Sequence, residues 1–364
     1  MSKDIYKQRT ERFKQLMEKN RIDAVMIRNI YSFAYFTGIP WWQPAVLLPL
    51  KEPPIIFAFE DEVEELRKWT WIDKILGYRK VEELMKSVTS HIRQLNVQSL
   101  GFDIDIDASA LLFEQFRNLN PGKKIVNVHG LIMKLRMIKD PTEIELIRKA
   151  SEIAKTSLEA AINAVSAGVT ETAIAGEAEY AARKQGAESI LVYVNAGKPR
   201  IHAHPMNKKI KDGDAVMIDV MPAFRGYFSD IAHTVFVGSA SNEQRKAFHA
   251  FNEAVETYIA ELKPKLKLNE LERKVQEVYK QHGVEKYYVY GFAHGVGLRF
   301  EEDPITTIIV AQRATEVEEN MVLNVGHAPL TGKEIGTIKT EDTVLVKKDR
   351  AEKFVDFKKE LLEV

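Results

Sequence analysis

Residues 217–238, MIDVMPAFRGYFSDIAHTVFVG, place the strongest constraint on the fold of this chain. Two apolar runs flank a short turn, which predicts a β-hairpin, and each run carries one aspartate, Asp219 or Asp230. Both positions are symmetric about the midpoint of Phe224–Arg225, so a short loop centred there would make the aspartates direct cross-strand partners. Like charges placed in this way repel, and burial adds to the cost. The hairpin therefore predicts a positive partner, either a basic side chain or a metal ion, unless one aspartate is exposed or lies in the turn.

The composition limits the class of protein and its partners. The chain has 364 residues, of which 45% are hydrophobic and 29% charged, so we expect two or three domains with substantial cores. Lys+Arg and Asp+Glu both number 52, which argues against nucleic acid or an anionic membrane as the main partner. The sequence contains no cysteine, which excludes disulfides, thiolate nucleophiles and zinc–thiolate sites.

The N-terminal segment MSKDIYKQRTERFKQ is polar and charged, so we expect no signal peptide. No apolar run approaches the roughly 18 residues that a bilayer-spanning helix needs. These features predict a soluble, cytoplasmic protein.

Helix and strand patterns divide the chain into two parts. Residues 1–130 alternate helical and strand-like segments, which predicts a small α/β domain. Residues 131–364 begin with a long helix, for which Asp140 is the expected N-cap, Pro141 the first residue and Glu143 the capping-box partner. The order of helix pair, strands, helix pair and strands that follows predicts an α+β domain.

Three further stretches carry residues suited to chemistry. His294 precedes Gly-Val-Gly, which leaves bare backbone beside it, and Glu341 enters an apolar strand, where an acid needs a partner. His202 lies shortly before the hairpin. Two Asp, one His and one Glu are ligands that Mn, Co, Fe or Zn accept, and a carboxylate-bridged pair of such ions can activate water.

The order, spacing and flanking residues of these motifs resemble the pita-bread family of prolidases, Xaa-Pro aminopeptidases, methionine aminopeptidases and creatinase. The resemblance covers nearly the whole chain through LRMIKDPTEIELIRKA, the GYFSD hairpin, HGVGL and EDTVLV, and the length is similar to that of short microbial Xaa-Pro dipeptidases. It implies a creatinase-type α/β domain over 1–130 and a pita-bread α+β catalytic domain over 131–364, with a curved antiparallel sheet and helices on its outer face. It also implies a homodimer that acts on a small peptide or another small C–N substrate.

The resemblance assigns metal-ligand roles to four residues, which are Asp219, Asp230, His294 and Glu341. The family's fifth ligand, a glutamate, falls on Gly326, which His327 follows. We therefore expect a divalent metal, Mn, Co or Zn, as one or two ions, with a metal-free site as the alternative; His327 could supply the missing donor if a bulge turned it inward.

Other positions also depart from the family pattern. Glu301 stands where the family has a second histidine, and Lys339 stands where an arginine is common. His202 matches the family's first active-site histidine, so His202, Glu301 and His327 are the candidate proton carriers. Three functions stay open, namely an Xaa-Pro metallopeptidase with an altered site, a creatinase-like C–N hydrolase without metal, and a non-catalytic binding protein.

Four residues are candidates for substrate binding. Trp41 and Trp42, in IPWWQP, could wall a small pocket, or else they pack in a core or a dimer contact. Arg299 and Lys339 could bind a substrate carboxylate. The alternative for these two is a salt bridge to a nearby acid, Glu301, Glu302 or Asp342.

Overall fold

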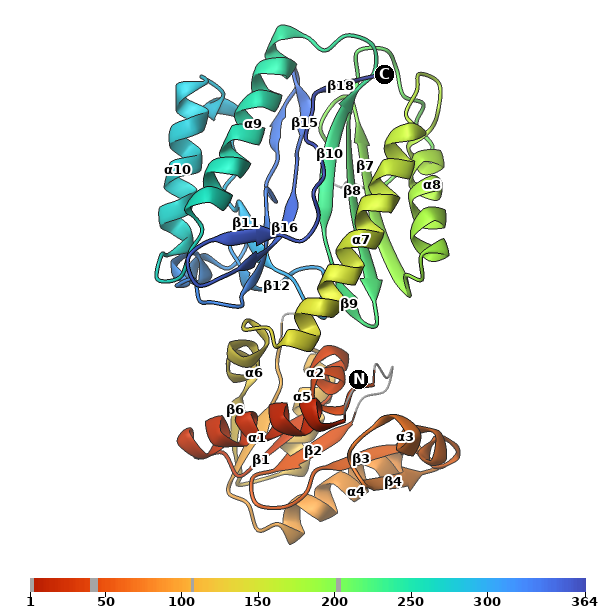
Figure 1. Ribbon diagram of the computed structural model, residues 1–364. Helices are drawn as coiled ribbons and strands as arrows, with labels where there is room; N and C mark the ends of the chain where they lie inside the picture. Colours follow the sequence, from red (N-terminus) through yellow and green to blue (C-terminus); the bar gives the residue numbers. More distant parts are fainter. Residues whose placement is uncertain (1–2, 40–44, 106–107, 201–203) are drawn as a thin grey trace. The chain divides into compact units, whose positions relative to one another are not determined.

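The computed structural model describes residues 3–39, 45–105, 108–200 and 204–364 (Figure 1). The chain forms two compact units, residues 1–136 and 137–364. The domain boundary predicted after residue 130 falls inside the helix His129–Arg136.

The first unit is an α/β domain built on a six-stranded mixed sheet in the order β4-β3-β2-β1-β5-β6. Its core lies between the sheet and helices α4 and α5, where Leu84, Val88 and Phe116 pack against strand residues such as Leu47 and Phe57. The elements of this unit are α1 (Asp4–Lys19), β1 (Ala24–Ile27), α2 (Ile30–Thr37), β2 (Val46–Pro49), β3 (Ile55–Phe59), η1 (Glu60–Glu62), α3 (Val63–Trp69), β4 (Lys74–Tyr78), α4 (Val81–Gln94), β5 (Ser99–Phe102), α5 (Ala110–Leu119), β6 (Lys124–Asn127) and α6 (His129–Arg136).

The second unit pairs two helices with each of two sheets. Helices α7 and α8 pack on the sheet β18-β10-β8-β7, and helices α9 and α10 pack on the sheet β12-β11-β13-β16-β17 (Figure 1). Helix α7 starts as predicted, because the Asp140 side chain accepts hydrogen bonds from the amides of Thr142 and Glu143, and the Glu143 side chain accepts one from the Asp140 amide. An α/β unit followed by an α+β unit confirms the predicted fold class.

The bounds in the second unit are α7 (Pro141–Asn163), α8 (Glu171–Lys184), β7 (Ser189–Ala196), β8 (Ala215–Phe224), β9 (Tyr227–Phe228), β10 (Ile231–Phe236), α9 (Asn242–Glu261), α10 (Leu268–Gln281), η2 (Glu285–Tyr287), β11 (Ala293–Gly295), β12 (Glu302–Ile305), η3 (Val310–Ala314), β13 (Val322–Val325), β14 (Leu330–Gly332), β15 (Gly336–Ile338), β16 (Asp342–Val346), β17 (Ala351–Lys353) and β18 (Leu362–Glu363).

One backbone bridge joins the two sheets of the second unit and positions the site. Glu341, directly before β16, donates its amide hydrogen to the carbonyl of Ala232 in β10. This contact brings the aspartate hairpin β8–β10 beside β11, which carries His294, and beside β13, which Gly326 and His327 follow. Among the described residues, no helix combines the length and apolar character that crossing a bilayer requires.

Candidate metal centre

The hairpin places Asp219 and Asp230 on one face, but not as direct partners. Arg225 and Gly226 form the turn with φ values of +50° and +80°, so Phe224 pairs with Tyr227 and Asp219 pairs with Ala232. The prediction of direct pairing was therefore wrong, because the turn is centred one residue later than Phe224–Arg225. Asp230 is two residues before Ala232, so it is a diagonal neighbour of Asp219 across the hairpin. Its carboxylate still lies within 4.8 Å of those of Asp219 and Glu341.

A lysine supplies the positive charge beside the hairpin. The Lys339 ammonium lies 2.6 Å from Asp219 Oδ2 and 2.5 Å from Glu341 Oε2, and its side chain is only 5% exposed. Thr234 fixes the lysine backbone, because its hydroxyl donates to the Lys339 carbonyl and accepts from the Lys339 amide. The salt bridge expected to Glu301, Glu302 or Asp342 is replaced by these two ion pairs.

His294 lies on β11 with one ring nitrogen directed at the acids. Its Nδ1 donates to the Gly295 carbonyl at 2.9 Å, which leaves Nε2 as the unprotonated atom. Nε2 lies 3.6 Å from Asp230 Oδ2 and 3.8 Å from Glu341 Oε1. Burial, with a smaller contribution from His327, lowers the pKa of His294 to about 4, so the ring is neutral and able to bind a metal at neutral pH.

A β-bulge after β13 turns His327 toward the same carboxylate. The amides of Gly326 and His327 both donate to the Phe292 carbonyl, so two residues oppose one. Gly326 has φ +104°, and a Cβ atom there would lie 2.1 Å from the Thr340 carbonyl oxygen, so the bulge depends on glycine. His327 Nδ1 then lies 3.6 Å from Glu341 Oε1, as the inward turn predicts.

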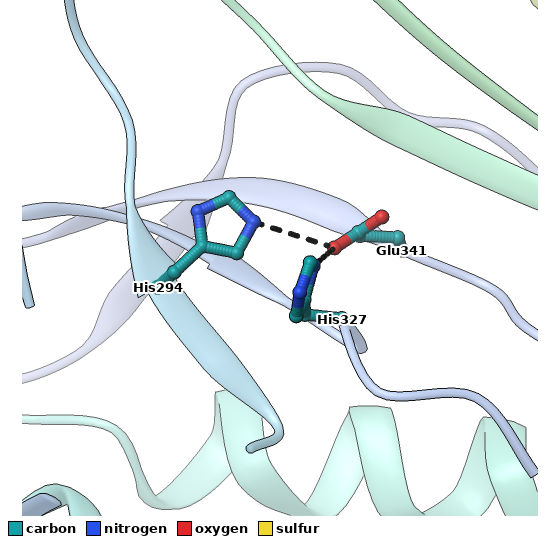
Figure 2. A group of neighbouring side chains, drawn as sticks. All are labelled: His294, His327 and Glu341. Carbon is teal, nitrogen blue, oxygen red and sulfur yellow. Dashed lines mark ion pairs between the residues drawn. The ribbon is translucent and has the colours of Figure 1, made fainter. Parts of the chain in front are cut away.

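Two groups of possible ligands share Glu341 as a result: His294 with His327, and Asp219 with Asp230. Figure 2 shows the His294 and His327 rings pointing at the same Glu341 oxygen, and Asp230 Oδ2 lies near His294 Nε2. The successive separations are 3.6, 3.8 and 3.6 Å. Donors held about 2.1 Å from a common tetrahedral ion are about 3.4 Å apart. A small contraction of the His294–His327–Glu341 group, with Asp230 beside His294, would therefore suit a metal.

Several of these buried atoms have no hydrogen-bond partner in the described chain. They are Asp219 Oδ1, Asp230 Oδ1, His294 Nε2 and His327 Nδ1. Buried polar atoms are nearly always hydrogen-bonded, so a converging set of unpaired lone pairs fits a cation. The residues present therefore suit a divalent metal with mixed imidazole and carboxylate ligands.

The electrostatics of the acids agree with this interpretation. Burial raises the pKa of Asp219 despite the Lys339 charge, and burial together with Asp219 and Glu341 raises the pKa of Asp230 well above its usual range. Burial would also raise the pKa of Glu341, but the charges of Lys339 and His327 outweigh it and lower that pKa. Asp230, which Lys339 does not contact, is thus the carboxylate of the cluster that most lacks positive charge.

Two neighbours of the aspartates were missed from the sequence. Thr343 Oγ1 accepts from the Asp230 amide and donates to the Asp230 carbonyl at 2.8 Å, which holds Asp230 in place directly before β10. Tyr193 on β7 pairs directly with Asp219, and burial, with the charges of Asp219 and Asp230, raises the pKa of its hydroxyl, which therefore stays protonated. Cross-strand pairing alone could have indicated Tyr193, but only with the correct register.

The other predicted site residues fall into two groups. Glu301 lies at the edge of the cluster, with Oε1 3.8 Å from His327 Nε2, and Arg299 is half-buried two residues before it. His202, Trp41 and Trp42 lie outside the described residues.

Comparison with known proteins gives consistent matches over both units. The model of metallopeptidase family M24 matches residues 145–348, and that of the creatinase/prolidase N-terminal domain matches residues 9–138. The Xaa-Pro dipeptidase of Pyrococcus furiosus is 28% identical over 98% of this chain and 100% of its own length; that of Lactobacillus helveticus is 27% identical over 96% and 97%. The solved prolidase of Pyrococcus horikoshii superposes with a TM-score of 0.88 at 26% identity, covering 98% of this chain and 100% of its own. The Xaa-Pro dipeptidase of Bacillus anthracis superposes with a TM-score of 0.90 at 25% identity over 99% and 100%.

Proposed function

Because the chain belongs to metallopeptidase family M24 and carries a creatinase/prolidase-type N-terminal domain, we propose that it hydrolyses Xaa-Pro dipeptides with a divalent metal. The resemblance inferred from the sequence motifs is confirmed by these matches. The observation that carries the proposal is that the unpaired His294 Nε2 lies beside the carboxylates of Asp230 and Glu341, and that Glu341 also belongs to a second group of possible ligands with Asp219 and Asp230. The relatives described as Xaa-Pro dipeptidases span the whole chain, which favours a peptide substrate over the two alternatives.

Of the four predicted ligands, Asp230, His294 and Glu341 would hold the metal, which would be Mn, Co or Zn, with Asp219 beside them. When bound there, the metal would lower the pKa of a water molecule and polarise the scissile carbonyl. The protein's own residues then have to carry protons from the water to the leaving imino nitrogen of proline. Glu301 is the best-placed described carboxylate, because it lies at the half-exposed edge of the cluster, and His202 is the second candidate from the sequence.

Arg299 is our candidate for the substrate carboxylate. The residue is half-buried and stands two positions before Glu301, whose carboxylate lies at the edge of the cluster, and a guanidinium suits a carboxylate partner. Lys339 was an equal candidate from the sequence, but its ammonium contacts two protein carboxylates and is almost inaccessible. We therefore assign Lys339 to the carboxylate cluster and not to the substrate.

Hydrolysis of a proline dipeptide such as Ala-Pro, compared with the matched dipeptide Ala-Ala, tests the proposal. Protein freed of metal with a chelator and reloaded in turn with Mn, Co or Zn should cleave Ala-Pro, and Asp230→Asn should abolish both metal binding and cleavage. If the loaded protein cleaves neither peptide yet hydrolyses a guanidino compound such as creatine without metal, the creatinase-like alternative replaces the proposal. A thermal shift with such compounds in the absence of any turnover would favour the binding protein.

Two finer expectations accompany this function. A tryptophan of the pair Trp41–Trp42 walls the substrate pocket; unchanged KM in both Trp41→Ala and Trp42→Ala would refute it. A cytoplasmic homodimer is expected from the family resemblance, and sedimentation of the purified protein together with cell fractionation tests that expectation.

A further inference from the structure

We propose that this chain holds a single metal ion, in a subsite made by Asp230, His294, His327 and Glu341, and that the Lys339 ammonium permanently takes the place of a second ion. The inference rests on the proposed function, because it concerns the same centre. It assigns His327 as a ligand, and it separates the five acidic and imidazole residues of the cluster into one subsite that accepts metal and one that does not.

The two oxygens of Glu341 carry the first step. Oε1 faces the nitrogens of both imidazoles, at 3.8 Å from His294 Nε2 and 3.6 Å from His327 Nδ1. Oε2 lies 2.5 Å from the Lys339 ammonium. A carboxylate that bridges two metal ions gives one oxygen to each ion, and here the second oxygen is already paired with a fixed cation.

The second step is that Lys339 also neutralises the other acid of that subsite. Its ammonium lies 2.6 Å from Asp219 Oδ2, so it contacts two of the three carboxylates in the Asp219–Asp230–Glu341 group. This group has no imidazole, whereas the His294–His327–Glu341 group has two. Imidazole nitrogens favour Zn and Co over harder ions, so the metal-accepting subsite has the more selective ligands.

Formal charge gives the third step. Three buried carboxylates and one ammonium leave two negative charges in the cluster, which one divalent ion balances. A second divalent ion would leave the same buried site with excess positive charge, which is costly in a low-dielectric interior. Asp219 Oδ1 and Asp230 Oδ1 have no hydrogen-bond partner, so the oxygen subsite would be ready for an ion if the lysine were removed.

Glu301 supports the assignment of His327 as a ligand. Its Oε1 lies 3.8 Å from His327 Nε2, on the opposite side of the ring from Glu341. This separation is longer than a hydrogen bond, but a slight approach would let Glu301 accept from Nε2 and fix the tautomer that leaves the nearer nitrogen to bind a metal. His327 therefore replaces the carboxylate donor that would otherwise stand at Gly326.

Metal stoichiometry tests the inference without recourse to activity. Protein loaded with excess Zn or Co and freed of unbound ions should contain one equivalent per chain by elemental analysis. Lys339→Met should bind close to two equivalents. The control Lys359→Met, which removes another buried lysine paired with Asp342 at 2.6 Å, should stay at one.

A histidine pair provides the second arm of the experiment. His327→Ala should weaken the affinity for Zn at least tenfold and change the visible absorption spectrum of the Co form, because one nitrogen ligand is lost. His282→Ala, a comparably exposed histidine paired with Glu253, should change neither. If Lys339→Met does not fold, the wild-type stoichiometry and the His327→Ala result still decide the matter.

The outcomes separate this inference from the proposed function. Two equivalents in the wild type, with Xaa-Pro cleavage, would overturn the single-ion assignment and leave the peptidase proposal intact. No metal in the wild type under any condition would overturn both. If the wild type binds one equivalent and His327→Ala has the same metal affinity, His327 is not a ligand.

Discussion

Gly326→Ala should destabilise the second unit far more than an ordinary glycine substitution. The residue has φ +104°, a conformation that costs an L-residue about 1–2 kcal/mol. The new Cβ would also lie 2.1 Å from the Thr340 carbonyl oxygen, where ordinary contact begins near 3.4 Å, so the backbone must shift. Such overpacking costs about 1–3 kcal/mol, which gives a total loss of about 2–5 kcal/mol in the free energy of unfolding.

The glycine Gly168 provides a matched control for this experiment. It has φ +89°, and an added Cβ would meet nothing within 4 Å, so Gly168→Ala should lose only the conformational part, about 1–2 kcal/mol. Urea unfolding followed by far-ultraviolet circular dichroism measures both variants. The four tryptophans lie at or before Trp71, so tryptophan fluorescence reports on the first unit and should not shift. Equal losses in the two variants would refute the claim that the bulge needs a bare backbone at Gly326.

Three further predictions concern buried titratable side chains of the second unit. Glu171→Ala should lower the free energy of unfolding, measured with urea, by about 3–5 kcal/mol. The Glu171 carboxylate is buried, accepts from the amides of Ala196 and Met206, and pairs with Arg200 at 2.6 Å, so its loss leaves the arginine without this partner. A loss below about 1 kcal/mol would contradict this reasoning. Burial and the Lys359 charge lower the pKa of His233 from 6.5 to about 4. As the pH falls, the histidine of the unfolded chain is therefore protonated before that of the folded chain, and stability present above pH 6.5 is lost as the pH falls toward 4. The loss is on the order of 3 kcal/mol, and His233→Gln should flatten this part of the stability–pH curve; an unchanged slope would exclude His233 as its source. Metal affinity, measured by competition with a chelator, should fall as the solution turns mildly acidic, since the raised pKa values of Asp219 and Asp230 let protons compete; a pH-independent affinity would contradict the assignment of Asp230 as a ligand.

Local sequence signals predicted the helices well. The capping box at Asp140–Glu143 gave the start of α7, because these side chains satisfy amides within the same turn, and Thr170 caps α8 in a similar way. Residues 305–310, ITTIIV, have the β-branched character of a strand, yet β12 ends at Ile305 and the chain turns into η3. Arg313 donates to the Thr306 and Thr307 carbonyls there, a tertiary contact that strand propensity does not reveal.

The hairpin register was predictable in principle. Gly226 suits the second position of a two-residue turn in which both residues have positive φ, and centring the turn on Arg225–Gly226 gives the observed pairing of Asp219 with Ala232. The residue types of the cluster were also evident from the sequence, because an acid in an apolar strand requires a partner. The contacts of Lys339 were not, since they depend on how a residue 120 positions away enters the same face of the sheet.

The original constraint, two aspartates in one apolar hairpin, offered a basic side chain or a metal ion as alternatives. The structure gives a reason why both can apply at one centre. Lys339 lies against Asp219 and one oxygen of Glu341, whereas the other Glu341 oxygen faces two imidazoles and Asp230 faces one of them. A fixed ammonium cannot activate water, but it offsets part of the negative charge and lowers the number of ions that the cluster needs. His327 supplies an imidazole in place of one carboxylate ligand. A site with one divalent ion has less positive charge to balance than a site with two, so it requires fewer negatively charged ligands.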